Sequence, residues 1–344
     1  MEKKMQESFH TIRELAEIRE KEILSPYASL SEQSKGRERE EEPCDIRTAY
    51  QRDRDRILHC KAFRRLKHKT QVFLCPQGDH YRDRLTHTLE VSQIARTMAV
   101  ALSLNEYLTE AIALGHDLGH TPFGHSGEHV LNQLNPGGFV HCEQSVRVVE
   151  VLEKKGQGLN LTWEARDGIR NHRTSGHPST LEGRCVQLAD KIAYINHDID
   201  DAERAGILKE EDIPIEYRRI LGCSAKERLN TMIHDIVENS MGKSEVGPTA
   251  DIEWAMGNLR KFMFRNVYTG SIAKAEEGKA ESVIRSLYDY YTEHLESLPE
   301  EYLIMIYHRG EGVERVVCDY ISGMTDQYAM AKYTDLFIPK LWQF

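Results

Sequence analysis

The sequence predicts an all-α protein, and three observations favour that class. Apolar residues recur at spacings of three and four over most of the chain, which is the period of an amphipathic helix. No convincing run alternates apolar and polar residues in the way that a half-buried β-strand does. No glycine-rich segment joins a strand pattern to a helix pattern. The segments below are therefore interpreted as helices joined by turns.

The chain is long and acidic. It has 344 residues, of which 40% are hydrophobic and 29% charged, a mixture typical of folded globular proteins and sufficient for one large domain or two. Its 45 Lys and Arg and its 55 Asp and Glu give a formal net charge of −10. Coating of nucleic acid is driven by neutralisation of phosphates, so the acidic total argues against that function.

The cysteines and the N-terminus indicate a cytoplasmic protein. Seven cysteines, an odd number, include no CxxC pair, so we expect reduced thiols and neither a disulfide framework nor a zinc knuckle. The first residues are charged and lack the apolar centre of a signal peptide. No stretch approaches the roughly 18 apolar residues that a membrane-spanning helix needs.

Residues 1–45 predict an N-terminal helix followed by a charged arm. Isoleucine and leucine recur at helical spacing within residues 1–24. Residues 31–43 contain almost no apolar side chains and end in a proline, which indicates a mobile segment.

Residues 46–205 predict a helical core, and residues 206–344 predict helices added to it. In the core, apolar periodicity indicates helices over residues 48–73, 83–103, 105–120, 139–153, 165–171 and 181–205. Residues 75–79 form a turn by composition. Beyond the core, amphipathic segments lie near 214–240, 251–265, 270–295 and 312–332. We expect them to complete the pocket and to supply subunit contacts.

Sixteen histidines stand out in the composition, and two of them predict a metal site together with two aspartates. His87 lies on one predicted helix, His116 and Asp117 end the next, and Asp190 lies on a third. Imidazole and carboxylate are good ligands for Mn²⁺, Fe²⁺, Co²⁺, Ni²⁺ or Zn²⁺, and Mg²⁺ is suitable with more waters. Four protein ligands leave positions for water and a substrate oxygen, which a catalytic metal requires.

The adjacent His116 and Asp117 constrain the local geometry. Neighbouring residues on a helix diverge by about 100°, so both can reach one ion only at a helix end or a bend. Gly119 and Pro122 follow directly and supply a reason for such a bend.

The order of these four residues along the chain resembles the HD phosphohydrolase superfamily. Within it, the sequence resembles the bacterial deoxyguanosine triphosphate triphosphohydrolase family. The resemblance extends over nearly the whole chain after residue 45. It is carried by five strings: QRDRDRI at 51–57, AFRRLKHKTQVF at 62–73, RLTHTLEV at 84–91, HDLGHTPFGHSGE at 116–128 and DYISGMTD at 319–326. It implies a multi-helix HD-domain phosphohydrolase fold with additional C-terminal helices. It also implies metal-dependent hydrolysis of a deoxynucleoside triphosphate to deoxynucleoside and triphosphate by attack at the α-phosphorus.

The resemblance assigns catalytic roles to three residues. His125 and Glu128 are three residues apart, so on a helical turn the carboxylate can orient the imidazole as an acid/base pair beside the α-phosphate. The step that His125 serves, activation of water or protonation of the departing 5′-oxygen, is left open. His120 is four residues beyond His116 and is expected to touch the α-phosphate.

A triphosphate carries about four negative charges and needs cationic groups around it. Between residues 52 and 84 the chain has ten Lys or Arg against four Asp or Glu, a net charge of +6. Part of this run is interpreted as a solvated helix face. Arg84, one turn before His87, is expected to contact phosphate, and the other candidates are Arg65, Lys191 and, after a glycine-rich loop, His141.

Base and sugar contacts are expected from two further segments. By resemblance to the eukaryotic dNTP triphosphohydrolase, Gln71 and Val72 meet the base. Tyr194 and Asp198 lie four and eight residues past Asp190 on one helical face. The resemblance implies that they stack on the sugar and bond its 3′-hydroxyl, so that the tyrosine ring would leave no room for a 2′-hydroxyl.

The main hypothesis is a dNTP triphosphohydrolase with dGTP as the leading substrate. Two alternatives to it stay open. One is another HD phosphohydrolase, a nucleotidase or a hydrolase of cyclic nucleotides or guanosine tetraphosphate. The other is a nucleotide-sensing or single-stranded nucleic-acid-binding protein. The family resemblance further implies a homo-oligomer, such as a hexamer, and dNTP effectors. The +6 segment leaves nucleic-acid contact open as a side activity. Tyr320 or Asp326 is expected to approach the substrate.

Overall fold

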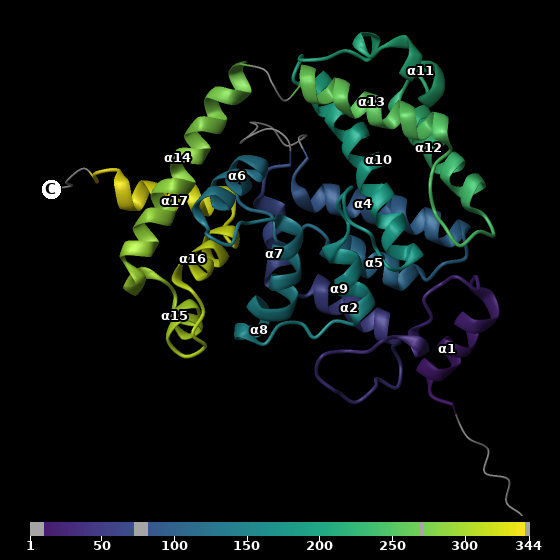
Figure 1. Ribbon diagram of the computed structural model, residues 1–344, viewed down its shortest axis with the longest axis horizontal. Helices are drawn as coiled ribbons and strands as arrows, with labels where there is room; N and C mark the ends of the chain where they lie inside the picture. The colour runs from purple at the N-terminus through teal and green to yellow at the C-terminus, as the bar shows by residue number, and fades with distance from the viewer. Residues whose placement is uncertain (1–9, 72–81, 268–270, 341–344) are drawn as a thin grey trace, which may run out of the picture.

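The computed structural model describes residues 10–71, 82–267 and 271–340, and regular structure in these ranges is helical (Figure 1). This confirms the all-α prediction. Within the same ranges, β-type pairing is confined to two isolated bridges, between Arg37 and Thr162 and between Thr70 and Asp83. Every described cysteine is a free thiol, and Cys75 lies outside the described residues.

The N-terminal residues form helix α1 (Ile12–Ile23) and the 3₁₀ turn η1 (Ser31–Gln33). Thr11 and Glu14 form a capping box that starts α1. After η1, the prediction of a mobile arm over 31–43 is wrong, because this segment is bonded to the helical core.

Two buried carboxylates hold the 31–43 segment. The Arg37 guanidinium pairs with Asp53, which is fully buried on the next helix. The N–H of Lys35 donates to Glu164 at 2.7 Å, and Glu164 is 5% exposed. A segment with few apolar side chains is therefore ordered by hydrogen bonds to buried acids, which composition does not reveal.

The predicted helix over 48–73 is divided in the structure. Helix α2 (Ala49–Leu58) ends at Leu58, α3 (Lys61–Arg65) follows, and the 3₁₀ turn η2 spans Leu66–His68. Cys60 is extended, and its thiol accepts a hydrogen bond from Phe63 N–H at 3.3 Å, which starts the second helix in a new direction. The single prediction was wrong because apolar spacing continues across this break.

The first hydrophobic core is built around two long helices, α4 (Arg84–Ala101) and α10 (Leu181–Arg204), which pack against each other. Helices α5 (Glu106–Gly115) and α9 (Trp163–Arg170) pack against them. Side-chain caps define the starts, since Asp83 accepts from Thr86 N–H and Thr180 from Gly183 N–H.

Between α5 and α9 the chain forms the segment that carries most of the long motif. It contains α6 (Gly124–Leu134), α7 (His141–Arg147), the π-helical turn η3 (Val148–Leu152) and the short α8 (Glu153–Gly156). Gly119 permits the close approach of this segment to α7, because a Cβ there would lie 2.2 Å from Ser145 N.

The C-terminal residues divide between two cores. Three helices join the first core beside α10: α11 (Ile215–Leu221), α12 (Ala225–Ser240) and α13 (Ala250–Asn266). Four helices build a second core against α6: α14 (Ser271–Glu293), α15 (Glu300–Tyr307), α16 (Val313–Ser322) and α17 (Asp326–Phe337). Short 3₁₀ turns, η4 (Glu210–Asp212) and η5 (Leu295–Ser297), lie in the connections.

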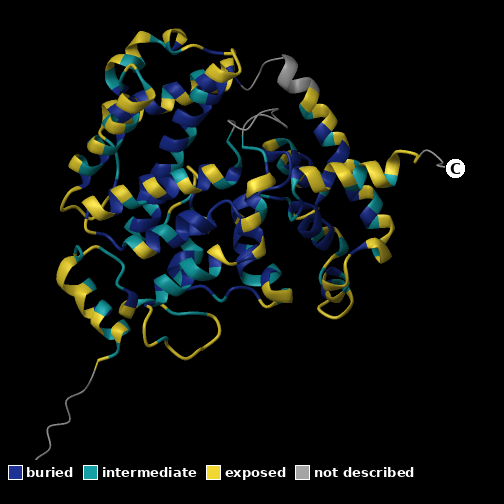
Figure 2. Cartoon of the chain, turned by 180° about the vertical axis from the view of Figure 1, so that it is seen from behind, coloured by how far each residue is buried: buried dark blue, intermediate teal, exposed yellow. Residues whose placement is uncertain are grey.

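The buried faces of both groups of helices point inward, and their exposed faces point outward (Figure 2). None of the described helices combines the length and the apolar character needed to cross a membrane.

Candidate active site

The four predicted metal ligands lie together in the structure. His87 projects from α4, Asp190 from α10, and His116 and Asp117 from the turn that follows α5. His87 Nε2 is 3.2 Å from Asp190 Oδ1, and His116 Nε2 is 3.4 Å from Asp117 Oδ1 and 4.0 Å from Asp190 Oδ1. Ligand atoms of His87, His116 and Asp117 all lie within 4.8 Å of one another.

The tautomer of His116 is set by the end of α5. Its Nδ1 lies 2.6 Å from the carbonyl oxygen of Ala113, so the ring proton is on Nδ1. The Nε2 lone pair then faces carboxylate oxygens, which are also acceptors, and this buried nitrogen has no hydrogen-bond partner. An acceptor buried among acceptors is stabilised only by a cation between them.

His87 has the same tautomer, for a different reason. His197 Nε2 lies 2.9 Å from Glu90 and donates to that carboxylate, which leaves its Nδ1 as an acceptor. His87 Nδ1 lies 3.5 Å from this acceptor, so its Nε2 lone pair faces Asp190. Histidine ligands of metals usually donate their other N–H to an outer partner in this way.

The spacing of the four residues fits a divalent cation. Ligands about 2.1 Å from one metal lie about 3.0–3.4 Å from each other in octahedral or tetrahedral geometry, which is the separation found here. Burial opposes ionisation of Asp117, but the hydrogen bond with His120 and the charge of the Arg84 guanidinium hold its pKa well below the ordinary value. His87, His116, Asp117 and Asp190 would therefore hold the ion.

Arg84 is bonded to one of these ligands. Its guanidinium Nη1 lies 2.8 Å from Asp117 Oδ2, and the side chain is almost fully buried at the start of α4. This contact occupies one oxygen of Asp117 and leaves Oδ1 toward His116 and His120. Arg84 also lines the cavity described below, as expected of a phosphate contact.

The three predicted catalytic residues lie beside the metal ligands. His120 Nε2 is 3.2 Å from Asp117 Oδ1, and its ring stacks on that of His141 with centroids 4.0 Å apart. His125 and Glu128 share a turn of α6, with Nδ1 and Oε2 3.8 Å apart, and the His125 side chain is 72% exposed.

Glu128 has a closer partner than His125. Its carboxylate accepts from His141 Nδ1 at 3.0 Å and from the His141 backbone N–H at 3.0 Å. Burial would raise the pKa of Glu128, but these bonds and the contact with His125 lower it below the ordinary value. Glu128 therefore orients two imidazoles, His125 and His141, of which the sequence interpretation paired only the first.

The sequence analysis missed His172. It follows α9, is buried, and places Nε2 3.2 Å from His141 Nε2, while its ring centroid is 5.0 Å from that of His116. Burial lowers the pKa of His172 to about 3, so this imidazole is neutral. A single histidine just after a short helix carries no spacing signal, so sequence reasoning had no reason to select it.

One cavity of about 760 Å³ unites these groups. This is within the about 300–1,000 Å³ typical of small-molecule sites. The predicted residues on its wall are Gln71, Arg84, His87, Asp117, His120, His125, Glu128, His141, Asp190, Lys191 and Tyr194. The wall also includes Arg260 of α13 and Glu277 of α14, so both cores contribute. Val72 lies outside the described residues.

Comparisons with known proteins cover almost the entire chain. Residues 84–195 match the HD domain and residues 246–335 match the phosphohydrolase-associated domain. A deoxyguanosinetriphosphate triphosphohydrolase-like protein of Caldanaerobacter subterraneus is 61% identical over 96% of this chain and 97% of its own length. A protein of the same name from Clostridium perfringens is 53% identical over 96% of this chain and 98% of its own.

The chain belongs to the deoxyguanosinetriphosphate triphosphohydrolase-like family. It is accordingly an HD-domain phosphohydrolase, and the HD match contains all four predicted ligands. HD domains are metal-dependent hydrolases, in agreement with the fit of the cluster to a cation. A solved structure of a hypothetical protein from Aquifex aeolicus is 20% identical, with a TM-score of 0.46 over 84% of this chain and 68% of that one.

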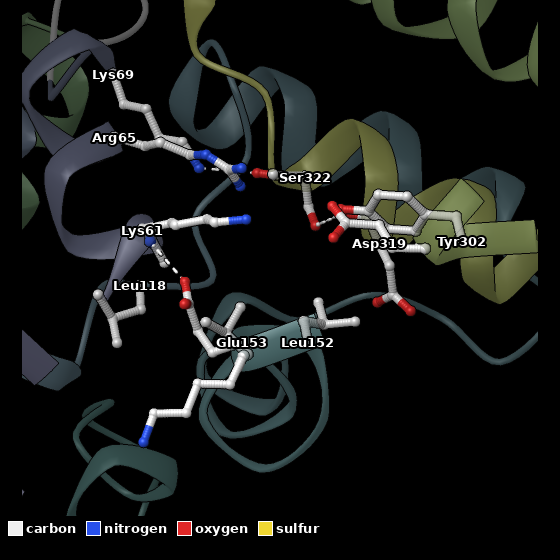
Figure 3. A pocket seen from close by; sticks show the side chains of 14 residues that line it. Lys61, Arg65, Lys69, Leu118, Leu152, Glu153, Tyr302, Asp319 and Ser322 are labelled. Carbon is white, nitrogen blue, oxygen red and sulfur yellow. Dashed lines mark hydrogen bonds between the residues drawn. The ribbon is translucent and has the colours of Figure 1, made fainter. Parts of the chain in front are cut away.

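Several other residues that the family resemblance selected lie away from the cavity. Arg65 lines a different pocket, where it lies with Lys61 and Lys69 opposite Tyr302 and Asp319 (Figure 3). Arg65 is not on the wall of the cavity that holds the histidine cluster, and its phosphate contact stays a prediction.

The cationic run over 52–84 does not form one surface. Arg52 and Arg56 pair with Glu41, and Arg54 approaches Glu110 at 3.4 Å. These side chains are only 16–27% exposed and pair with other segments, so they differ from the solvated helix face that was predicted. Of the ten basic residues, Arg84 alone lines the described cavity wall.

Asp198, Tyr320 and Asp326 are not among the residues of the cavity wall, and their substrate contacts stay predictions. Asp198 is fully buried on α10 and is not on the cavity wall, and burial raises its pKa well above the ordinary value. Tyr320 packs in the second core, with its ring 5.0 Å from Tyr291. Asp326 accepts hydrogen bonds from backbone groups, among them Phe123 N–H, and does not line the cavity.

Proposed function

We propose that this protein hydrolyses deoxynucleoside triphosphates, with dGTP favoured, to deoxynucleoside and intact triphosphate by attack of water at the α-phosphorus. One observation carries the proposal. A single cavity of about 760 Å³ has the metal-ligand cluster, the histidine–carboxylate group of α6, and the cationic Lys191 and Arg260 on its wall. The printed name of the 61% identical relative supports this substrate class.

The cluster supplies the electrophilic part of the reaction. A divalent cation bound there would withdraw charge from an α-phosphate oxygen and lower the pKa of a bound water. The chain's own contribution is rigidity: Arg84 holds Asp117, and Ala113 and His197 hold the rings of His116 and His87. Ligands fixed in this way need no rearrangement when a substrate binds.

Proton transfer is assigned to His125 with Glu128. When water adds to the α-phosphorus, the bond from phosphorus to the 5′-oxygen breaks, water loses a proton and the 5′-oxygen gains one. His125 lines the cavity, and Glu128 lies 3.8 Å from its Nδ1, so the carboxylate can orient the imidazole for either of these transfers.

The wall of α10 is assigned to phosphate and sugar. Lys191 is adjacent to Asp190 and supplies positive charge for the phosphates. Tyr194 is one turn further, and Arg260 lies over its ring, 5.9 Å from the centroid. A deoxyribose packed on this ring would leave no space for a 2′-hydroxyl, which is the physical reason for selecting deoxynucleotides. Gln71, also on the wall, is assigned to the base.

Product analysis tests the reaction. The Mn²⁺-loaded protein is incubated with each dNTP and with GTP in H₂¹⁸O, and nucleoside, monophosphate, pyrophosphate and triphosphate are separated by chromatography. We expect deoxynucleoside and triphosphate, with ¹⁸O in the triphosphate. Release of monophosphate would favour the alternative of another HD phosphohydrolase. The absence of turnover with every divalent metal would favour the alternative of a nucleotide-binding protein without this activity.

A variant pair tests the acid/base assignment. His125→Ala should lower kcat about 10²–10⁴-fold, the usual contribution of a general acid or base, with bound metal unchanged. His177→Ala, at an exposed position in the loop before α10, is the matched control and should retain activity. Equal kcat values for the two variants would contradict the assignment.

Assembly and effectors belong to the same proposal. From the family resemblance we propose a homo-oligomer, plausibly a hexamer, whose assembly or activity responds to dNTPs. Light scattering with and without each dNTP tests this, and a monomer under all conditions would contradict it.

A further inference from the structure

A small pocket lies between the two hydrophobic cores, separate from the cavity that contains the metal ligands (Figure 3). Its wall is formed by α3, η3, α8, α15 and α16, together with Lys69 after η2. Its volume is about 30 Å³ on the scale on which the larger cavity measures about 760 Å³. A single water needs about 10–15 Å³, so this pocket has room for one small ion and none for a nucleotide. We call it the basic pocket.

Two basic side chains of α3 enter the basic pocket without an anionic partner. Lys61 and Arg65 lie one turn apart, and both project toward the pocket (Figure 3). Within the described part of the chain, neither side chain makes a hydrogen bond or an ion pair. Like charges that share a partly enclosed space repel each other, so this arrangement favours a bound anion.

Lys69 adds a buried cation beside Arg65. Its side chain is 2% exposed, and its ammonium donates to the carbonyl oxygens of His120 and Ser322, which do not neutralise its charge. Burial first, and then the positive charge of Arg65, lower the pKa of Lys69 to about 7. The two cations are thus close enough to repel, and an anion between them would offset that repulsion.

Tyr302 of α15 lies opposite these cations and has an unused hydroxyl. The residue is 8% exposed and lines the pocket, and within the described residues its hydroxyl has no hydrogen-bond partner. Burial raises the pKa of Tyr302, and the charge of Arg65 opposes that shift, so the guanidinium lies near the hydroxyl. A buried hydroxyl without a partner calls for an explanation, and a missing acceptor in the pocket supplies one.

The acidic residues on the wall do not supply that acceptor. The carboxylate of Asp319 is already paired with Arg147 and Arg315, neither of which lines the pocket. Glu153 accepts from the backbone N–H of Ala62 at 2.8 Å. Lys154 and Glu301 are exposed residues of opposite charge on the same wall. Lys61, Arg65 and Lys69 therefore leave the basic pocket with an excess of positive charge.

We propose that the basic pocket binds one tetrahedral oxyanion, inorganic phosphate, through the Arg65 guanidinium, the Lys61 ammonium and the Tyr302 hydroxyl. The guanidinium can bond two phosphate oxygens with its planar fork, and the remaining oxygens can accept from Lys61 and Tyr302. This contact differs from the substrate contact predicted for Arg65, because the basic pocket is not part of the larger cavity. The inference goes beyond the proposed function and does not depend on it.

A bound phosphate would connect the two cores beside the metal ligands. Arg65 belongs to α3 and Tyr302 to α15, so one ion would bridge a helix of each group. Leu118, which follows Asp117, lines the same pocket, and Lys69 bonds the His120 carbonyl. Since a ligand that binds only the folded protein stabilises it, phosphate should raise the thermal midpoint.

Equilibrium dialysis against ³³P-labelled inorganic phosphate tests the proposal. The full chain, with metal removed by a chelator, is dialysed in chloride buffer at a series of phosphate concentrations. We expect one saturable site in the wild type and a Kd about tenfold or more higher in Arg65→Gln and in Tyr302→Phe, because each loses a hydrogen bond to a charged ligand. Arg64→Gln, at an exposed position on the same helix, is the matched control and should keep the wild-type Kd.

Two further arms identify the site and the ligand. Lys191→Gln, on the wall of the larger cavity, should bind phosphate as the wild type does; loss of binding there, with Arg65→Gln unaffected, would overturn the proposal. Unlabelled sulfate should displace phosphate, and dGMP should not. Displacement by dGMP alone would mean that the site takes a nucleotide, against the proposal.

The thermal midpoint gives a second readout. Phosphate should raise the midpoint of the wild type and of Arg64→Gln, and the increase should disappear in Tyr302→Phe, which removes only a hydroxyl and keeps the ring in its core. Urea denaturation checks that each variant is folded. No bound phosphate at any concentration in the folded wild type would refute the site, whatever the protein does with dNTPs.

Discussion

Asp326 Oδ1 accepts a hydrogen bond from the backbone N–H of Phe123 at 2.9 Å, across 203 residues of sequence. Its other oxygen accepts from Thr70 N–H at 2.9 Å. Phe123 has a φ of +62°, a left-handed conformation that is costly for a bulky residue and persists only where surrounding structure enforces it. The start of α17 thus holds the turn that separates Asp117 from His125, and the second core shapes a site whose metal ligands belong to the first.

Removal of this carboxylate should therefore affect both stability and activity. Asp326→Ala leaves two backbone N–H groups without their acceptor, and each buried orphan costs about 1–3 kcal/mol. We expect a lower free energy of unfolding in urea and a reduced kcat/KM. Asp335→Ala, on the exposed face of the same helix, is the control and should change neither. Wild-type kcat/KM in Asp326→Ala would show that the turn keeps its form without the anchor.

Asp117 is the ligand on which the metal site depends most. Asp117→Ala should abolish bound metal, measured by mass spectrometry of the metal, and turnover, while the far-ultraviolet circular dichroism stays helical. The variant also leaves Arg84 buried without a partner, and an unpaired buried charge costs about 3–5 kcal/mol. Its thermal midpoint should fall. Asp289→Ala, an exposed carboxylate on α14, should keep the metal and turnover; near-wild-type activity in Asp117→Ala would refute the site.

Arg37 should be a major stabilising residue although it lies in a charged, polar segment. Its partner Asp53 is fully buried, so Arg37→Met leaves this carboxylate without a cationic partner, bonded only to Thr162. We expect a loss of about 3–5 kcal/mol in the free energy of unfolding. Arg39→Met, at an exposed position in the same segment, should cost less than about 1 kcal/mol. Equal urea midpoints for the two variants would show that the segment contributes nothing to folding.

Lys69 should make stability depend on pH. It is buried and donates to the carbonyl oxygens of His120 and Ser322, and burial lowers its pKa to about 7 from an ordinary value of 10.5. Between these pH values the unfolded chain binds the proton more tightly, so the free energy of unfolding should rise with pH across that window, by roughly 3–5 kcal/mol.

Comparison with Lys69→Met isolates this effect. Urea denaturation at several pH values should show the rise in the wild type and in the exposed-site control Lys67→Met, and its loss in Lys69→Met. Parallel pH profiles for all three proteins would mean that Lys69 stays charged throughout.

Most of the fold was predictable because helical periodicity is a local property. The segments of α4 and α10 were predicted with small errors at their ends, because apolar residues recur along them at helical spacing, whereas the helix predicted over 105–120 extends beyond the end of α5 at Gly115. The failures have a common cause. The 31–43 segment depends on Glu164 and Asp53, and the start of α3 after Cys60 depends on Glu153, which accepts from Ala62 N–H at 2.8 Å. These partners lie outside the segments themselves.

The residues of the candidate site also fall into two groups, those that the sequence reveals and those that only tertiary contacts reveal. The sequence motifs contain the four predicted metal ligands, His87, His116, Asp117 and Asp190, so these could be selected from the sequence. His172 could not, because its contact with His141 spans 31 residues and leaves no local pattern. Arg65 was selected by charge and lines another pocket, and charge alone does not tell which pocket a side chain lines.

The amino-acid sequence alone settled the all-α class, the family and the set of metal-ligand candidates, because these depend on periodicity and on residue types at short spacing. Tertiary packing decided the rest. It directed the Nε2 lone pairs of His87 and His116 toward the neighbouring carboxylates, joined Glu128 to His141, and placed Asp326 behind the Phe123 turn. The physical reason is that hydrogen-bond direction and ring tautomer are set by partners that become neighbours only when both cores are assembled.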